Sequence, residues 1–333
     1  IIKILRVFAM LTIIVTHLCQ FYSFVALRSL LIGVPLFFLI SGYLYGGKNQ
    51  DIKTFFWSRI KTTYIPTFLY QLFVFLYSII VLGMIPSILD VIMHFLNLQG
   101  INNIFWQIKY YPFSSCSIAW FMTIIMFCYF LVPLLQHARD NKKLERGGQI
   151  CVIGIVVVVI LTFVNIRIHY LWIFLVGYLL SYCYKQIEKK QVLISLFITV
   201  LLWGIRIFSR RFIDGTIIYN EIIAVFSGDM LAIFLLVCMK YIGGYSQLAF
   251  EKIEKVSQNK IINWLDKMSL YIYLTHYLFF KGFWSVTNIT SNIILQTILL
   301  IVLTIPTAYV LLFLSKTVGS WIDKIIKSRS KTV

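Results

Sequence analysis

Apolar stretches separated by short polar connections follow one another along the whole chain. A stretch of about 20 apolar residues is the length that an α-helix needs to cross the hydrocarbon layer of a membrane. The alternating segments of roughly ten residues that are typical of membrane β-barrels are missing from this pattern. It therefore predicts an all-α fold, a polytopic membrane helix bundle with about ten transmembrane helices, over residues 4–25, 28–46, 63–83, 119–136, 149–166, 169–184, 192–208, 219–240, 268–287 and 293–315.

The connections between these helices differ in charge. Of the 30 Lys and Arg residues, 23 lie towards the two chain ends and in alternate connections, and seven lie on the other side. Because cytoplasmic connections carry the excess of basic residues, both termini are predicted to be cytoplasmic. The longest outer connection, residues 84–118, is aromatic and modestly polar, and we expect it to include an interfacial or re-entrant segment. Residues 1–333 are expected to form a single membrane-embedded domain.

Composition narrows the class of protein. The chain is 60% hydrophobic with a mean hydropathy of +0.88, far more apolar than a soluble domain requires. Most of the net charge of +18 comes from basic residues on the predicted cytoplasmic side. The expected partner is therefore the lipid bilayer, and nucleic acid is not expected. The six cysteines form no CxxC pair, and no spacing of His, Cys and carboxylates predicts a metal site.

The first predicted helix contains the stretch RVFAMLTIIVTHLC, in which Arg6 and His17 stand in a mostly apolar run. Charged groups inside membrane helices are costly, so each one is a candidate functional residue. Eleven residues at about 100° each place the two side chains on one face, about 16 Å apart along the helix axis. Two interpretations stay open: a functional pair, or an arginine that anchors the helix end and a histidine that bonds to a neighbouring helix.

Four further motifs follow in the order of the predicted helices: GVPLFFLISGYLYG in the second, SRIKTTYIP leading into the third, AWFMTIIMFCYFLVP in the fourth and SLYIYLTH in the ninth. With Arg6 and His17 they make the chain resemble the acyltransferase-3 family of integral membrane acyltransferases. The residues that carry the resemblance are Gly33, Pro35, Phe37, Phe38, Ser41, Gly42, Tyr43, Arg59, Lys61, Pro66, Trp120, Phe121, Tyr129, Pro133, Ser269, Tyr273, Leu274 and His276.

Three positions depart from the family's pattern. Lys61 stands where an arginine is common, and Ala119 stands where many members have a histidine before the Trp-Phe pair. Tyr271 occupies the region in which some members carry an acidic residue. The departures concern the groups that would orient the histidine and the acceptor.

The resemblance implies an O-acyltransferase of the bacterial cytoplasmic membrane. It implies transfer of an acyl group, usually acetyl, from cytoplasmic acetyl-CoA to a hydroxyl of a cell-surface or membrane-linked glycan. His17 is then the catalytic base, because a hydroxyl is a weak nucleophile and histidine is the usual base near neutral pH. Arg6 belongs to the same catalytic pair, and cations at the cytoplasmic entrance would hold the CoA phosphates. The residues assigned to acetyl-CoA are Arg6, Arg59, Lys61, Ser41 and Tyr43, and those assigned to the acceptor are Trp120, Tyr273 and His276.

Structural roles stay open for several of these residues. Trp120 also suits an aromatic belt at the membrane surface, and Ser41 with Gly42 suits close helix packing. His276 also suits a structural hydrogen bond. Ion pairing between the seventh and eighth helices is expected for three charged residues, Arg206, Glu221 and Asp229.

At the level of the whole protein, two other functions compete with catalysis. A polysaccharide transporter or exporter could use the same helix bundle, but the repeat-related halves or broken helices expected of a transporter are not visible in the sequence. A membrane sensor or scaffold is the third possibility. Three features stay open: the identity of the acceptor, whether the acyl group passes through a covalent intermediate on His17, and whether polysaccharide-biosynthesis partners or a second copy of the chain take part.

Overall fold

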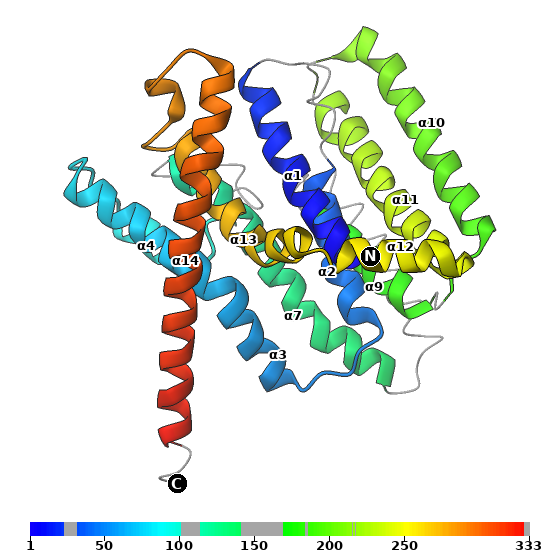
Figure 1. Ribbon diagram of the computed structural model, residues 1–333, viewed down its shortest axis with the longest axis horizontal. Coiled ribbons are helices and arrows are strands. Elements are labelled where there is room, and N and C mark those ends of the chain that lie inside the picture. The colour runs from blue at the N-terminus through cyan, green and yellow to red at the C-terminus, as the bar shows by residue number, and fades with distance from the viewer. Residues whose placement is uncertain are drawn as a thin grey trace. The chain divides into compact units, whose positions relative to one another are not determined.

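The computed structural model describes residues 1–22, 32–100, 114–140, 169–183, 186–214, 216 and 218–329. Every regular element among these residues is a helix (Figure 1), so the predicted all-α fold is confirmed for the described part of the chain. The predicted span at 149–166 lies outside the described residues. Each of the other predicted spans overlaps a described helix, which is compatible with about ten transmembrane helices.

Length and hydropathy identify the helices that can cross a membrane. Among the described residues, two apolar helices are shorter than a full crossing, Gly33–Gly46 and His169–Tyr182. Six are long and apolar enough on their own, Ile2–Cys19, Ile52–Ile80, Ser115–Asp140, Lys189–Ile213, Ala224–Tyr245 and Ile293–Ser328. The chain is thus a multi-pass membrane protein.

The chain forms two compact units. The first comprises Ile1–Asn49 and Cys128–Lys267, and the second comprises Gln50–Phe127 and Met268–Val333. Two helices, α7 (Trp120–Asp140) and α13 (Lys260–Phe280), run from one unit into the other. The other elements of the first unit are α1 (Ile2–Phe21), α2 (Gly33–Gly46), α9 (His169–Cys183), α10 (Lys189–Ile213), η5 (Ile218–Ile223), α11 (Ala224–Tyr245) and α12 (Gln247–Ser257).

Close packing of α2 against α9 forms the centre of the first unit. A Cβ atom added to Gly42 would lie 1.9 Å from the carbonyl oxygen of Phe174, and one added to Gly177 would lie 2.0 Å from that of Leu39. The two backbones therefore touch, which only glycine permits at these positions and which is typical of membrane helix pairs. The glycine of the Ser41–Gly42 pair accordingly serves close packing, one of the two roles open for that motif.

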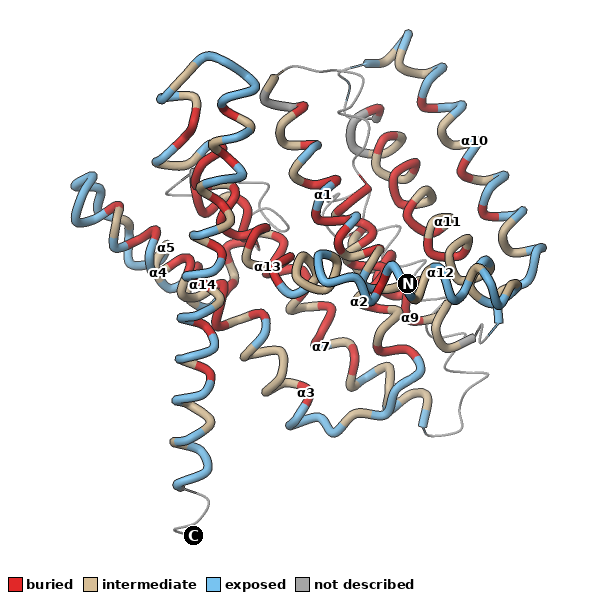
Figure 2. Tube along the Cα trace, in the orientation of Figure 1, coloured by how far each residue is buried: buried red, intermediate tan, exposed pale blue. Residues whose placement is uncertain are grey.

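A row of polar side chains joins α10 to α11. The Thr199 hydroxyl lies 3.1 Å from the Met230 carbonyl oxygen, and the Trp203 indole N–H donates to the Ser227 carbonyl at 3.0 Å. Arg206 is buried and donates to the Ser227 hydroxyl at 3.0 Å. The opposite face of α10 is exposed and apolar (Figure 2), as expected of a helix that meets lipid.

The second unit carries an irregular helix at its start. Its other elements are α3 (Ile52–Arg59), η2 (Ile60–Tyr64), α4 (Ile65–Ile80), α5 (Ile88–Phe95), η3 (Ser114–Ala119), η6 (Val286–Asn288) and α14 (Ile293–Arg329). Asp51 caps α3 by accepting the Thr54 backbone N–H, a bond that lowers the pKa of the Asp51 carboxyl. The run α3–η2–α4 starts earlier than the predicted span at 63–83.

The π-helical turn η2 has an identifiable cause in the sequence. Pro66 has no N–H and so leaves a carbonyl of the preceding turn without its usual partner. The chain widens there, and the Ile65 N–H donates to the Ile60 carbonyl five residues earlier. Such turns are frequent at functional sites, and Lys61 lies within this one.

The predicted outer connection at 84–118 contains the short helix α5 and the 3₁₀ turn η3, while its residues 101–113 lie outside the described residues. The Tyr64 hydroxyl of η2 donates to the Phe95 carbonyl at the end of α5. The re-entrant or interfacial character of this connection stays a prediction.

Gly42→Ala tests the packing of α2 on α9. The added methyl group overlaps a backbone carbonyl, so we expect a loss of about 1–3 kcal/mol in the free energy of unfolding, measured as thermal unfolding of the full chain in detergent. Gly204→Ala is the matched control, because a Cβ there meets nothing within 4 Å and alanine favours a helix by about 1 kcal/mol over glycine. Equal stability of the two variants would contradict the contact.

Candidate functional site

An ion pair fixes Arg6 at the start of α1. Its Nη2 lies 2.7 Å from Oδ2 of Asp266 on α13, in the part of that helix that belongs to the first unit. One helical turn earlier on both helices, the Lys3 ammonium donates to the Asn263 side-chain oxygen at 2.7 Å. Two polar contacts thus join the beginning of α1 to the beginning of α13.

Arg6 is held by Asp266 but stays exposed enough to bind a ligand as well. The Asp266 side chain is only 9% exposed, whereas that of Arg6 is 35% exposed. The Arg6 Nε is buried and donates to no group among the described residues. A guanidinium offers five donors, so binding one carboxylate leaves it able to bind an anion as well.

His17 lies on the same continuous helix, α1, and is half-buried. The two residues that lie between Arg6 and His17 on this face are Met10 and Ile13, which are 1% and 4% exposed. The stripe from the arginine to the histidine is therefore enclosed rather than turned to lipid.

Ser41 and Tyr43 flank the tight contact at Gly42 on α2, and both are half-buried. The ring of Tyr43 lies 5.4 Å from the Lys240 ammonium of α11, within the range of a cation–π contact. Lys240 is thus a further cation beside residues assigned to the donor, and it is not among the site residues predicted from the sequence.

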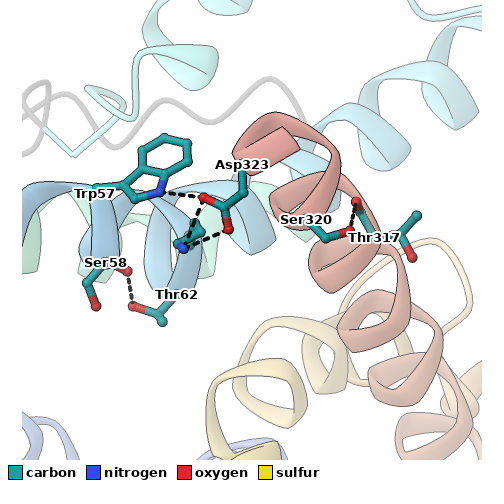
Figure 3. Close-up of polar contacts among 7 residues, drawn as sticks. Trp57, Ser58, Thr62, Thr317, Ser320 and Asp323 are labelled. Carbon is teal, nitrogen blue, oxygen red and sulfur yellow. Dashed lines mark hydrogen bonds and ion pairs between the residues drawn. The ribbon is translucent and has the colours of Figure 1, made fainter. Parts of the chain in front are cut away.

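Arg59 and Lys61 lie in the second unit, on α3 and η2, and each has neighbours of its own. The Asp323 carboxylate of α14 accepts the Trp57 indole N–H at 2.7 Å, as Figure 3 shows, and lies 3.0 Å from the Lys61 ammonium. Arg59 donates to the Ser58 hydroxyl at 3.0 Å. Lys61 therefore already has a carboxylate partner, which an anionic ligand would have to share or displace.

The three residues assigned to the acceptor all belong to the second unit. The Tyr273 hydroxyl donates to the Ile118 carbonyl at 3.1 Å, two residues before Trp120. The ring of Tyr273 lies 5.2 Å from that of Phe121 and 5.9 Å from that of His276.

His276 is 1% exposed, and its Nδ1 lies 2.7 Å from the Tyr273 carbonyl oxygen. A nitrogen this close to a carbonyl oxygen must donate, so a neutral ring keeps its lone pair on Nε2. The contact supports the structural role that sequence reasoning left open for His276, and it fixes which nitrogen could accept a proton.

The assigned residues therefore fall into two groups. Arg6, His17, Ser41 and Tyr43 belong to the first unit, whereas Arg59, Lys61, Trp120, Tyr273 and His276 belong to the second. Among the described residues, no group of three or more His, Cys, Asp and Glu side chains could hold a metal ion.

Two carboxylates, Asp266 and Asp323, were missed by sequence reasoning. The scarcity of acidic residues could have pointed to them. The chain has only 12 Asp and Glu against 30 Lys and Arg, and both carboxylates lie on or beside predicted membrane helices. Ion pairing was expected among Arg206, Glu221 and Asp229; Arg206 bonds to Ser227, and Asp229 lies 3.9 Å from His169 on α9. The side chain of Glu221 lies outside the described residues.

Helices long and apolar enough to cross a membrane, with Arg6 paired to the largely buried Asp266 and His17 on the same helix as Arg6, define an integral membrane protein with a polar interior. The family model of the acyltransferase domain of the acyltransferase-3 type matches residues 1–313, so the chain belongs to this family and is a membrane acyltransferase. Searches of curated proteins and of solved structures each gave no match.

Asp266→Asn tests the ion pair with Arg6. Removing one charge of a partly buried pair leaves the other without its partner, and we expect the full chain to lose about 1–3 kcal/mol of unfolding free energy in detergent. Asn263→Ala, which removes the exposed contact to Lys3 one turn away, should cost less than about 1 kcal/mol. A double-mutant cycle with Arg6→Met isolates the pair, and a coupling energy of zero would contradict it.

Proposed function

We propose that this membrane acyltransferase moves an acetyl group from cytoplasmic acetyl-CoA to a hydroxyl of a cell-surface or membrane-linked glycan, in the cytoplasmic membrane of a bacterium. The observation that carries the proposal is the enclosed stripe on α1 that begins at Arg6 and ends at His17, in a chain that belongs to the acyltransferase-3 family. An extended pantetheine arm would follow this stripe from the arginine towards the histidine.

The donor would be held by cations at its phosphates. Arg6 suits this role because about a third of its side chain is exposed while Asp266 holds the guanidinium in place. Arg59 and Lys61 are the other two candidates, and the π-helical turn at Lys61 supports a functional position. Ser41 and Tyr43 would line the same donor path.

His17 would act as general base. As the acceptor hydroxyl oxygen attacks the thioester carbonyl carbon, the imidazole takes the hydroxyl proton. The C–S bond then breaks, the ester forms, and the proton on His17 passes to the departing thiolate to give the free thiol of CoA. This role requires a neutral imidazole before attack.

The acceptor would meet the aromatic side chains of Trp120 and Tyr273, with His276 behind them. Tyr273 commits its hydroxyl hydrogen to the Ile118 carbonyl, so it would contact the acceptor through its ring or as a hydrogen-bond acceptor. Trp120 is half-buried, which leaves part of its ring available for a sugar face.

His17→Ala tests the proposed chemistry. Loss of the base should lower glycan O-acetyl ester by at least about 10²-fold in cells with equal amounts of the protein in the membrane. His137→Ala, an exposed histidine on α7 with no assigned role, should leave ester content unchanged. Ester that persists with His17→Ala would defeat the assignment, and a polysaccharide transporter would show altered glycan export rather than altered ester.

Arg59→Ala combined with Lys61→Ala tests the donor site. Removing two cations that face CoA phosphates should weaken acetyl-CoA binding to the purified full chain by about tenfold or more, measured by calorimetry. Lys189→Ala with Lys190→Ala removes the same charge from the exposed start of α10 and serves as the control. Equal affinities in the two double variants would remove Arg59 and Lys61 from the donor site.

A further inference from the structure

Asp229 is a carboxylic acid in the interior of the first unit. It lies on α11 and is 0% exposed. Neither of its carboxyl oxygens accepts a hydrogen bond from any group among the described residues. A buried carboxyl group without hydrogen bonds is costly in a protein and more so inside a membrane, so its presence needs an explanation.

A role in holding α10 to α11 does not explain Asp229. The contacts between these helices run through Thr199, Trp203 and Arg206, and their partners on α11 are Ser227 and backbone carbonyls. Asp229 takes part in none of these hydrogen bonds. Its ionisable neighbour is instead the first residue of α9, His169, whose Nε2 lies 3.9 Å from Oδ1 of Asp229.

A second buried polar group without a partner among the described residues lies on the same pair of helices. The Trp172 indole nitrogen is buried and donates to no group among the described residues. Trp172 follows His169 by one turn of α9, and its ring stacks on Phe226, 5.8 Å away, which precedes Asp229 by one turn of α11. An unused donor and two unused acceptors are therefore brought to the same contact between α9 and α11.

Aromatic rings form the rest of this contact. Tyr170 lies with its ring 3.7 Å from that of His169 and 4.8 Å from that of Phe38 on α2. The cluster of His169, Trp172, Phe226 and Asp229, with Tyr170 and Phe38 beside it, is called the α9–α11 cluster below. It combines ring surfaces with a carboxyl group and an indole N–H, and no member of it belongs to the catalytic or donor residues proposed above.

The chemistry of the α9–α11 cluster favours a hydroxyl group. A ligand must hydrogen-bond to the Asp229 carboxyl group and accept from the Trp172 N–H, and a hydroxyl group can both donate and accept. The gap of 3.9 Å between His169 and Asp229 is too long for a direct hydrogen bond, yet one oxygen atom can lie within bonding distance of both. A plain cation would leave the indole N–H unused.

We propose that the α9–α11 cluster is a binding site for a hydroxyl group of the glycan acceptor. The proposal rests on the proposed function, which supplies the assumption that the acceptor is a glycan. Water offers the same hydroxyl chemistry, and the experiment below separates the two sources. The predicted orientation supports the sugar, because His169 begins the predicted sixth span at its outer end and Asp229 lies in the outer half of the eighth, the side from which a surface glycan would come.

The test measures sugar binding to the purified full chain in detergent. The probes are the methyl glycosides of glucose, galactose, mannose, N-acetylglucosamine and rhamnose, and the readout is the concentration dependence of the unfolding temperature. We expect at least one probe to stabilise the wild type. Trp172→Phe keeps a ring against Phe226 and removes only the N–H, and it should weaken that probe's apparent affinity by about tenfold.

Asp229→Asn should weaken the apparent affinity for the same probe by a similar factor. Thr199→Val removes a hydrogen bond between α10 and α11 outside the cluster, so it should leave the affinity for that probe unchanged. Absence of stabilisation of the wild type by every probe overturns the proposal. If Trp172→Phe binds the probe as tightly as the wild type does, the proposal is also overturned, and water is then the only hydroxyl ligand of the cluster.

Ester content in cells separates this proposal from the proposed function. If His17→Ala abolishes glycan ester while Trp172→Phe keeps both wild-type ester and wild-type probe affinity, the α9–α11 site is wrong and the acyltransferase function stands. If a probe binds the wild type and not Trp172→Phe, but wild-type cells form no glycan ester, the site stands and the glycan O-acetyltransferase function is wrong.

Discussion

A charged side chain in an apolar helix needs a partner, and this constraint organises the polar interior of the protein. The chain has 30 Lys and Arg residues but only 12 Asp and Glu, so few carboxylates can serve. In each unit a carboxylate holds a cation assigned to the donor: Asp266 holds Arg6 at 2.7 Å, and Asp323 holds Lys61 at 3.0 Å. Both cations remain about a third exposed, so each pair fixes a positive charge without hiding it.

These pairings give the proposed donor cations a definite geometry before any ligand arrives. A guanidinium or ammonium that is already oriented loses less conformational freedom when it binds a phosphate, which favours affinity. The paired carboxylate also repels an anionic phosphate, so the two ion pairs limit the affinity for the proposed donor. If the donor is acetyl-CoA, as proposed, such a limit would help the release of CoA after each turnover.

Much of the fold could be predicted from the sequence because the membrane imposes a simple rule on helix length and polarity. The apolar runs located the described membrane helices to within a few residues for α1, α9 and α10, and the run over residues 4–25 correctly placed Arg6 and His17 on one helix. The glycine of the Ser41–Gly42 pair was open to a packing role, and its backbone contact with Phe174 shows why no larger residue fits.

The partners of these residues could not be predicted, because pairing depends on how distant helices meet. Arg6 and Asp266 are 260 residues apart, and Lys61 and Asp323 are 262 apart. No local period or spacing joins residues at such distances. Asp229 was expected to pair with the neighbouring helix α10, but it faces His169 on α9 instead, since Arg206 finds its partners in Ser227 and a backbone carbonyl.

The central claim is that this protein passes an acetyl group from acetyl-CoA to a glycan hydroxyl. The most direct measurement supplies acetyl-CoA with a radiolabelled acetyl group to the cytoplasmic face of membrane vesicles that contain the protein, and follows the label. The account predicts label in alkali-labile esters of the glycan, in vesicles with the wild type and not in vesicles with His17→Ala. Label that stays on CoA, or that enters glycan equally in vesicles without the protein, would contradict it.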